Sequence, residues 1–268
     1  MVPGNREELE LHGVQRATSR GPVGTLERGL TVLASLGAHF ADSDGMTLTQ
    51  IAASAGLPKP TTARLLATLA EYGFVEREGK SYRVGYQCFR LGNLYTFDEY
   101  LQRRALPIME ALAEEAREVV QLATLRDGQV LYLERVEPQR SITVVLSRPG
   151  STRPLYCTAL GKAMLACFEM GEVEDYLEQT TLEAKTPATI TSRDVLLDAL
   201  TATRERVYAV DEGESDEEVG CVAAPILDGA GGLVAAMSVS APRYRMSGES
   251  RDRAASLICS AAAKLSGG

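Results

Sequence analysis

Two cationic and two hydroxyl side chains gather in the segment "PKPTTAR", residues 58–64. They belong to Lys59, Thr61, Thr62 and Arg64. Ammonium, guanidinium and hydroxyl groups donate hydrogen bonds to phosphate oxygens, and a guanidinium fork can also bond the two acceptors on the edge of a guanine. These residues predict contact with a nucleic acid, with Arg64 as the reader of a base.

A second set of cations lies in "FVEREGKSYRVG", residues 74–85. β-forming residues flank Gly79 on both sides, which predicts a hairpin. The cations on this hairpin are Arg77, Lys80 and Arg83. We expect them to contact phosphates, which hold a protein on a duplex without reading its sequence.

Helices must position the first set of cations. Leucines recur at three- and four-residue steps from Thr25 onward, which predicts a helix, and "ADSDG" at 41–45 ends it. Thr47 is a suitable N-cap for a short second helix, and Gly56 supplies the left-handed position that ends that helix.

The third helix is expected to start at Pro58 and Pro60, because a missing amide costs nothing in the first turn, and to end near Tyr72. Three helices followed by a hairpin predict a winged helix-turn-helix, which lays one helix across the DNA backbone and presents the first turn of the next. Such units also serve as packing modules, and scattered cations commonly form a solvated face. The joint occurrence of the hairpin and the helix-start signals favours DNA binding.

Composition sets the limits for the whole chain. Its 268 residues suffice for two domains that each bury a core. The net charge is −8, but residues 1–90 hold 10 Lys and Arg against 9 Asp and Glu, whereas the remainder holds 18 against 27. A basic face is enough to attract DNA, so the acidic total does not exclude a DNA partner.

The sequence offers no metal, redox or catalytic cluster. The five cysteines form no CxxC pair, which argues against a zinc cluster or a disulfide framework. The charges nearest to Cys221 in the sequence are acidic, which disfavours a reactive thiolate. Both histidines, His12 and His39, lie in the first half, so the second half cannot build a Ser–His or Cys–His pair. We expect no cofactor, no metal and no enzymatic activity.

No run of 18 apolar residues is free of charge, and the N-terminal segment lacks the apolar core of a signal peptide. We therefore expect no membrane association and a cytoplasmic location. Residues 1–24 are polar and show no sustained period, which predicts a flexible tail.

Five segments, in order, resemble the motifs of the IclR family of bacterial transcription regulators: "TLERGLTVLASL", "MTLTQIAASAGLPKPTTARLLATLAEYGFVER", "YRVGYQCFRLG", "TALGKAMLA" and "GCVAAPILDGAGGLVAAMSVSAP". The resemblance runs from about residue 25 to the C-terminus. Many regulator families share the helix-turn-helix, but the ordered set with the closing "CVAAPI" and "SVSAP" segments is specific.

The resemblance and the sequence patterns together predict an α+β protein. Residues 88–116 have a helical pattern that we expect Pro107 to interrupt. Strands and helices then alternate, which indicates one mixed sheet, and the resemblance implies a GAF-like or profilin-like mixed α/β effector-binding domain. The expected parts are a tail at 1–24, a winged helix-turn-helix at 25–87, a linker helix at 88–105 and the effector-binding domain at 106–268.

The resemblance also implies an effector site. Carried over position by position, it consists of Ala159, Leu160, Asp211, Val219, Cys221, Ser238 and Ser240, with Ile142 and Val145 as an apolar wall. Independently of the resemblance, Ser238 and Ser240 share one face of a predicted strand. Buried hydroxyls are costly unless something bonds them, and that partner is either an effector or the backbone of a strand edge.

The sequence departs from the family at one position of this site. Family members that bind small keto acids carry a Gly-Ala step where this chain has Ala159 and Leu160. The bulk of Leu160 puts that ligand class in doubt. Lys162 is the one cation expected near the pocket, and a structural or solvated role suits it better than ligand binding.

The function predicted from these observations is a ligand-responsive transcription regulator that binds a palindromic operator in double-stranded DNA as an oligomer. Its effector would be a small organic molecule, either an organic acid or an aromatic metabolite, and its assembly a homodimer or a dimer of dimers. Leu91, Leu94 and Tyr95 recur at helical spacing on the linker helix and would be covered by a second chain. The alternatives are a hydrolase or transferase with a helix-turn-helix assembly domain, and a DNA-binding protein without a ligand.

Overall fold

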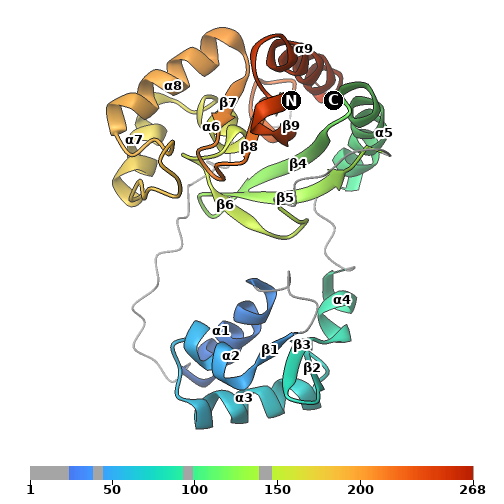
Figure 1. Ribbon diagram of the computed structural model, residues 1–268, viewed down its shortest axis with the longest axis vertical. Coiled ribbons are helices and arrows are strands. Elements are labelled where there is room, and N and C mark those ends of the chain that lie inside the picture. The colour runs from blue at the N-terminus through green and yellow to red at the C-terminus, as the bar shows by residue number, and fades with distance from the viewer. Residues whose placement is uncertain (1–23, 39–44, 93–98, 139–146, 268) are drawn as a thin grey trace, which may run out of the picture. The chain divides into compact units, whose positions relative to one another are not determined.

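The computed structural model of the chain describes residues 24–38, 45–92, 99–138 and 147–267 (Figure 1). The described residues form two compact units, which divide at the segment after residue 92. No described helix is long and apolar enough to cross a membrane.

The described part of the N-terminal unit consists of four helices and three short strands. They are α1 (Gly24–Ala38), β1 (Met46–Thr47), α2 (Leu48–Ser54), α3 (Lys59–Glu71), β2 (Val75–Glu78), β3 (Ser81–Val84) and α4 (Tyr86–Gly92). Strand β3 lies between β1 and β2 and pairs antiparallel with both. The two-residue strand β1 was not expected, because only its pairing with β3 makes it a strand.

Local chemistry starts the helices where the sequence predicts. Thr47 forms a capping box with Gln50: the Thr47 hydroxyl accepts from the Gln50 amide and the Gln50 side chain accepts from the Thr47 amide. Pro58 is the N-cap of α3, and Pro60 stands in its first turn. Gly56 has a φ of 64° in the turn between α2 and α3. Val32, Ile51 and Leu66 belong to the small core that these helices enclose.

The predicted break at Pro107 is wrong, because α5 (Glu99–Ala116) runs through it. Pro107 lies on the exposed side of the helix, whereas Ala105, Met109 and Leu112 are buried on the other. Burial of that face outweighs the loss of one helical hydrogen bond. On α4, Leu91 is exposed as expected, and Leu94 and Tyr95 lie outside the described residues.

The described residues of the C-terminal unit form one six-stranded sheet in the order β6-β5-β4-β9-β8-β7. Its strands are β4 (Val119–Arg126), β5 (Gln129–Val136), β6 (Thr152–Pro154), β7 (Ala209–Glu212), β8 (Val219–Leu227) and β9 (Leu233–Pro242). All described strand pairs are antiparallel, so the expectation of a mixed sheet is wrong. Neighbouring strands of the sheet are joined either by short hairpins or by long segments that contain helices, and neither kind of connection requires the two strands to be parallel.

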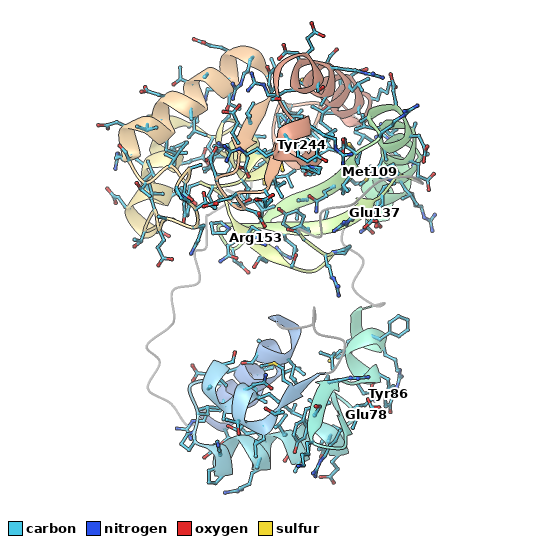
Figure 2. All side chains as sticks on the ribbon, in the orientation of Figure 1. Glu78, Tyr86, Met109, Glu137, Arg153 and Tyr244 are labelled. Atoms are coloured by element: carbon cyan, nitrogen blue, oxygen red, sulfur yellow. The ribbon has the colours of Figure 1, made fainter. Side chains whose placement is uncertain are left out.

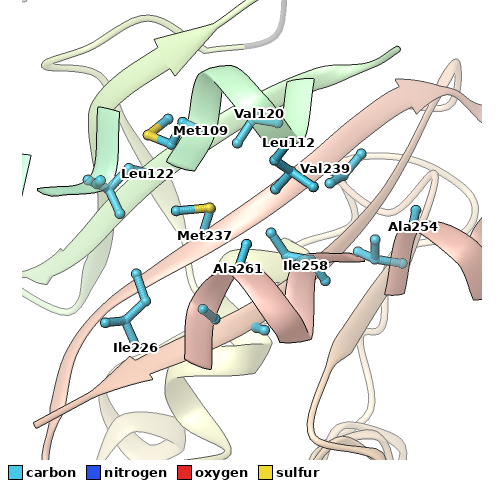
Figure 3. Packing of buried hydrophobic residues seen from close by; sticks show 14 of the residues in the cluster. Met109, Leu112, Val120, Leu122, Ile226, Met237, Val239, Ala254, Ile258 and Ala261 are labelled. Atoms are coloured by element: carbon cyan, nitrogen blue, oxygen red, sulfur yellow. The ribbon is translucent and has the colours of Figure 1, made fainter. Parts of the chain in front are cut away.

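Helices cover both faces of this sheet (Figure 1). One face packs against α5 and α9 (Gly248–Leu265), where Met109 and Leu112 meet Ile258 and the strand residue Met237 (Figure 3). The other face packs against α6 (Ala159–Leu165), α7 (Met170–Gln179) and α8 (Arg193–Arg206). A winged helix-turn-helix followed by an α/β domain is the fold class expected from the sequence.

Candidate functional site

The first turns of α3 carry the cations singled out in the sequence. Lys59 and Arg64 are exposed, and Thr61 is half-buried. Thr62 is fully buried, and its hydroxyl donates to the Pro58 carbonyl at 3.1 Å. The expectation that Thr62 lies on the exposed turn is therefore wrong. Thr62 and Leu66 are one helical turn apart and share the inner face of α3.

The wing presents its three cations on the strands and turn that the sequence predicts. Arg77, Lys80 and Arg83 are exposed. The Arg77 Nε donates to the Gly79 carbonyl at 3.1 Å, which holds this side chain along the turn. Arg83 pairs with Glu78 at 2.9 Å. Because both partners of that pair are exposed, the pairing costs little to exchange for a phosphate contact.

A row of polar side chains crosses the other unit, on the sheet face beneath α6. Strand register sets the row: Asp211 lies opposite Cys221, Cys221 opposite Ser240, and Ser238 opposite Gln121. At the other end of the row, Arg153 on β6 lies opposite Val130 on β5. Val130 is two residues from Tyr132 on β5, so both side chains lie on the same face. Every strand of the sheet thus contributes at least one polar residue to one face.

This row closes against α6 and two loops to form a cavity of about 20 Å³, room for one water molecule. Its lining residues are Gln121, Tyr132, Ser147, Arg153, Thr158, Ala159, Leu160, Asp211, Ser215, Cys221, Ser238 and Ser240. A ligand larger than water must displace part of this lining to enter.

Six of the nine residues predicted for the effector site meet at this cavity, namely Ala159, Leu160, Asp211, Cys221, Ser238 and Ser240. Val219 is buried in the same core but does not line the cavity. Ile142 and Val145 lie outside the described residues. The sequence analysis missed Gln121, Tyr132, Ser147, Arg153, Thr158 and Ser215, because only strand register and loop closure bring them to the site.

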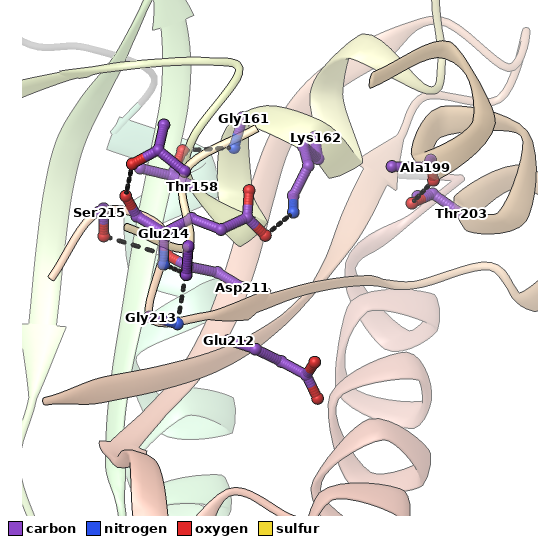
Figure 4. A network of polar contacts seen from close by, with 12 residues as sticks. Thr158, Gly161, Lys162, Ala199, Thr203, Asp211, Glu212, Gly213, Glu214 and Ser215 are labelled. Atoms are coloured by element: carbon purple, nitrogen blue, oxygen red, sulfur yellow. Dashed lines mark hydrogen bonds and ion pairs between the residues drawn. The ribbon is translucent and has the colours of Figure 1, made fainter. Parts of the chain in front are cut away.

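The acidic side of the cavity is held by bonds within the protein (Figure 4). One oxygen of Asp211 accepts from the Gly213 amide at 3.1 Å and the Glu214 amide at 2.6 Å, and the other accepts from the Ser215 hydroxyl at 3.0 Å. Burial raises the pKa of Asp211, and these bonds and the charge of Lys162 oppose that rise. Asp211 therefore shapes the loop that follows it as well as lining the cavity.

Lys162 is buried and pairs with Glu214, so its role is structural and it is not solvated (Figure 4). Burial raises the pKa of Glu214, and the neighbouring Lys162 opposes that rise. The expectation of a single cation near the pocket is wrong, because Arg153, which is labelled in Figure 2, is half-buried and lines the cavity.

The two serines on β9 differ in their bonding. The Ser240 hydroxyl donates to the Gln121 Oε1 at 3.4 Å, and the Gln121 Nε2 donates to the Ser147 carbonyl at 3.3 Å. The Ser238 hydroxyl is buried and has no partner among the described residues. A buried hydroxyl left without a partner costs about 1–3 kcal/mol, which a bound ligand can recover.

The remaining ionisable groups of the cavity are neutral at physiological pH. Burial raises the pKa of the Cys221 thiol, which opposes the formation of a reactive thiolate. Burial also raises the pKa of Tyr132 to about 12. The two groups therefore contribute hydrogen-bonding surface and no charge.

A larger hollow of about 900 Å³ lies along the outer edge of the sheet, near β6 and the end of α7. Its buried hydroxyls are already used: Tyr156 donates to the Glu183 carbonyl at 2.8 Å, and Tyr176 accepts from the Tyr156 amide at 3.2 Å. Volume alone does not make a site, so the small polar cavity is the better candidate.

Comparison with known proteins finds family models that match both units of the chain. Residues 95–267 match the model of the bacterial transcriptional regulator IclR C-terminal domain, and residues 25–79 match that of the IclR helix-turn-helix domain. The chain belongs to the IclR family. IclR proteins are transcription regulators, not enzymes, with a helix-turn-helix that binds DNA and a C-terminal domain that binds a ligand.

Two curated IclR relatives match over nearly the whole chain. The HTH-type transcriptional regulator BhcR of Paracoccus denitrificans is 33% identical over 94% of this chain and 89% of its own length. The transcriptional repressor IclR of Escherichia coli is 32% identical over 94% of this chain and 92% of its own.

A solved IclR homologue from Microbacterium hydrocarbonoxydans, complexed with 4-hydroxybenzoate, is 25% identical with a TM-score of 0.74. The match covers 90% of this chain and 97% of that one.

Proposed function

We propose that this IclR regulator acts in the cytoplasm, binds a palindromic operator as a homo-oligomer, and changes its operator affinity when a small organic effector enters the cavity beneath α6. The observation that carries the proposal is the row of polar side chains that all six strands bring to that cavity. A core built only for stability gains nothing from a buried hydroxyl such as that of Ser238, which has no hydrogen-bond partner among the described residues.

The DNA side of the proposal rests on the exposed cations of α3 and the wing. Arg64 stands on α3 one residue before Leu65, which packs against the core of the same unit. The inner face of α3 thus packs against the core, while the Arg64 side chain is exposed. We assign base reading to Arg64 and phosphate contact to Lys59, Arg77, Lys80 and Arg83.

The oligomer rests on apolar side chains that the described part of the N-terminal unit leaves exposed. On α4 they are Tyr86, Phe89 and Leu91, and on α1 they are Leu26 and Leu30. A homodimer covers such faces by symmetry, and two-fold symmetry matches a palindromic operator. Light scattering of the full chain at micromolar concentration tests this part, and a monomer contradicts it.

The ligand side is tested by mass spectrometry of the small molecules released from the purified protein, followed by operator titration with and without them. We expect a released molecule to shift operator affinity by about 5- to 150-fold, the usual range of such coupling. The double variant Ser238→Ala and Ser240→Ala should lose the shift and keep basal DNA binding. Exposed Ser250 provides a matched control, Ser250→Ala, which should keep both.

Two outcomes contradict the proposal. A shift that persists in the double serine variant places the effector elsewhere. Operator binding that no released molecule changes makes the chain a DNA-binding protein without a ligand.

A further inference from the structure

The outer face of α3 continues beyond the position assigned to base reading. Arg64, Ala67 and Thr68 are exposed, whereas Thr62 and Leu66 are buried on the opposite side of the helix. Ala67 and Thr68 follow Arg64 by three and four residues, so both lie about one helical turn beyond it on the same face. These two side chains therefore face the part of a partner that adjoins the contact of Arg64.

Two of the threonine hydroxyls on α3 are used within the helix. The Thr62 hydroxyl donates to the Pro58 carbonyl at 3.1 Å, and the Thr68 hydroxyl donates to the Arg64 carbonyl at 3.2 Å. A hydroxyl carries one hydrogen, so neither group has another to donate to a base. The exposed Thr68 therefore offers its methyl group to a neighbour, as Ala67 does.

The distance along the helix sets the place of these methyl groups on a duplex. Three to four residues of an α-helix rise about 4.5–6 Å along its axis. Successive base pairs are about 3.4 Å apart. A helix that lies in the major groove with Arg64 on a guanine thus brings Ala67 and Thr68 to a base one or two pairs away.

Thymine is the base whose major-groove edge suits this pair of methyl groups. It presents its C5-methyl group there, and the methyl groups of alanine and threonine make apolar contact with it. The side chain of Ala67 has no polar atom with which to bond the acceptors of guanine or the amino groups of adenine and cytosine. A thymine is therefore the best match for the surface next to Arg64.

We infer that Ala67 and Thr68 read a thymine in the operator half-site through its C5-methyl group, within two base pairs of the guanine that Arg64 reads. This inference rests on the proposed function, which places α3 on DNA with Arg64 as the base reader. It adds one further base to the sequence that the regulator recognises, and it assigns that base to two side chains without a free donor.

The test uses an operator that the full-length protein selects from a pool of random duplexes. The guanine read by Arg64 is the position at which Arg64→Ala no longer distinguishes between base pairs. Each thymine within two base pairs of it, on either strand, is then replaced by deoxyuridine, which removes the methyl group and keeps every hydrogen-bonding atom. We expect one such replacement to weaken wild-type binding about two- to fivefold, as the exposure of a single methyl group predicts.

Variants then assign the preference to the two side chains. Ala67→Gly combined with Thr68→Ser removes both methyl groups and keeps a hydroxyl at position 68, and this variant should bind the thymine and deoxyuridine operators equally. Thr49→Ser combined with Ala53→Gly makes the same two changes at exposed positions of α2 and carries a similar cost in helix stability. This matched control should keep the wild-type preference for thymine.

The outcomes separate this inference from the proposed function. A selected operator without a thymine in this interval, or wild-type binding that no deoxyuridine replacement weakens, overturns the reading of a methyl group and leaves the proposed function standing. Both results come from the wild-type chain, so they hold even if a variant fails to fold. A preference for thymine that persists in Ala67→Gly with Thr68→Ser belongs to other residues and overturns the inference equally. If the protein selects no duplex from the pool, the DNA side of the proposed function falls as well.

Discussion

The buried ion pair between Lys162 and Glu214 allows a quantitative test of the site. The two side chains are 4% and 9% exposed, and the second oxygen of Glu214 has no partner among the described residues. Such a pair contributes little compared with a neutral replacement of the same shape, but removing one partner leaves a buried charge. We therefore expect Glu214→Gln and Lys162→Met to be destabilising singly and nearly neutral together.

The size of the effect follows from the usual cost of removing one partner of a buried ion pair, about 3–5 kcal/mol, because the charge that is left behind has no partner. The negative charge of Asp211 attracts Lys162 and offsets part of that cost when Glu214 is replaced. We expect each single variant to lose about 2–4 kcal/mol of unfolding free energy, and the double variant about 1 kcal/mol.

Hydrogen exchange of peptides covering residues 209–227 measures this loss, because these peptides report on the C-terminal unit alone. The comparison of wild type, the two single variants and the double variant forms a double-mutant cycle. Single variants that stay within about 0.5 kcal/mol of wild type would refute the reasoning. A double variant that loses the sum of both single losses would refute it equally, since the two charges would then be independent.

Three further changes test other parts of the molecule. Arg64→Ala should lose about 1–3 kcal/mol of binding free energy on the specific operator and little on random duplex. Lys80→Ala should weaken binding to both duplexes and reduce the slope of log K against log salt concentration by about one. Titrations at several salt concentrations measure both effects. Val207 caps α8 with a φ of 67°, a strained conformation for a β-branched residue, so Val207→Gly should raise the unfolding free energy by about 0.5–1 kcal/mol in thermal melts. Burial raises the pKa of Tyr132 to about 12, above the pKa of a tyrosine in the unfolded chain. The stabilisation from the neutral Tyr132 phenol is therefore complete below about pH 10, and it falls by about 1.4 kcal/mol per pH unit between pH 10 and pH 12. Tyr132→Phe should remove this pH dependence from the unfolding free energies measured in urea.

The sequence predicts the parts of the fold that local chemistry determines. Thr47 and Pro58 start α2 and α3, and the turn at Gly79 separates the two strands of the wing. In each case the signal is a cap, a turn residue or an apolar period within about ten residues.

Features that depend on contacts between residues far apart in the sequence cannot be predicted from local patterns. Pro107 ends a helix in most contexts, and only the packing of Ala105 and Met109 on the sheet explains why α5 continues. Thr62 is polar and next to cations, yet its position one turn before Leu66 places it in the core.

The cavity illustrates the same limit. Its strand residues Ser238 and Ser240 could be predicted from alternation together with the family resemblance. Arg153 could not, because a three-residue strand carries no period and its place depends on pairing with β5. The hydrogen bonds from the Gly213 and Glu214 amides to Asp211 could not be predicted either. Because these bonds hold the loop after β7, Asp211→Ala is expected to disturb folding as well as any ligand contact.

The join between β4 and β9 has a consequence for how the regulator matures. Residues 119–154 supply one half of the sheet and residues 209–242 the other, and the halves meet where Gln121 pairs with Ser238. During synthesis more than a hundred residues must follow the end of β4 at Arg126 before its partner strand β9 begins at Leu233, and such long-range pairing is slow. Under the proposed function, a newly made chain responds to the effector only after β9 has docked, and an effector that contacts both β4 and β9 slows the separation of these two strands.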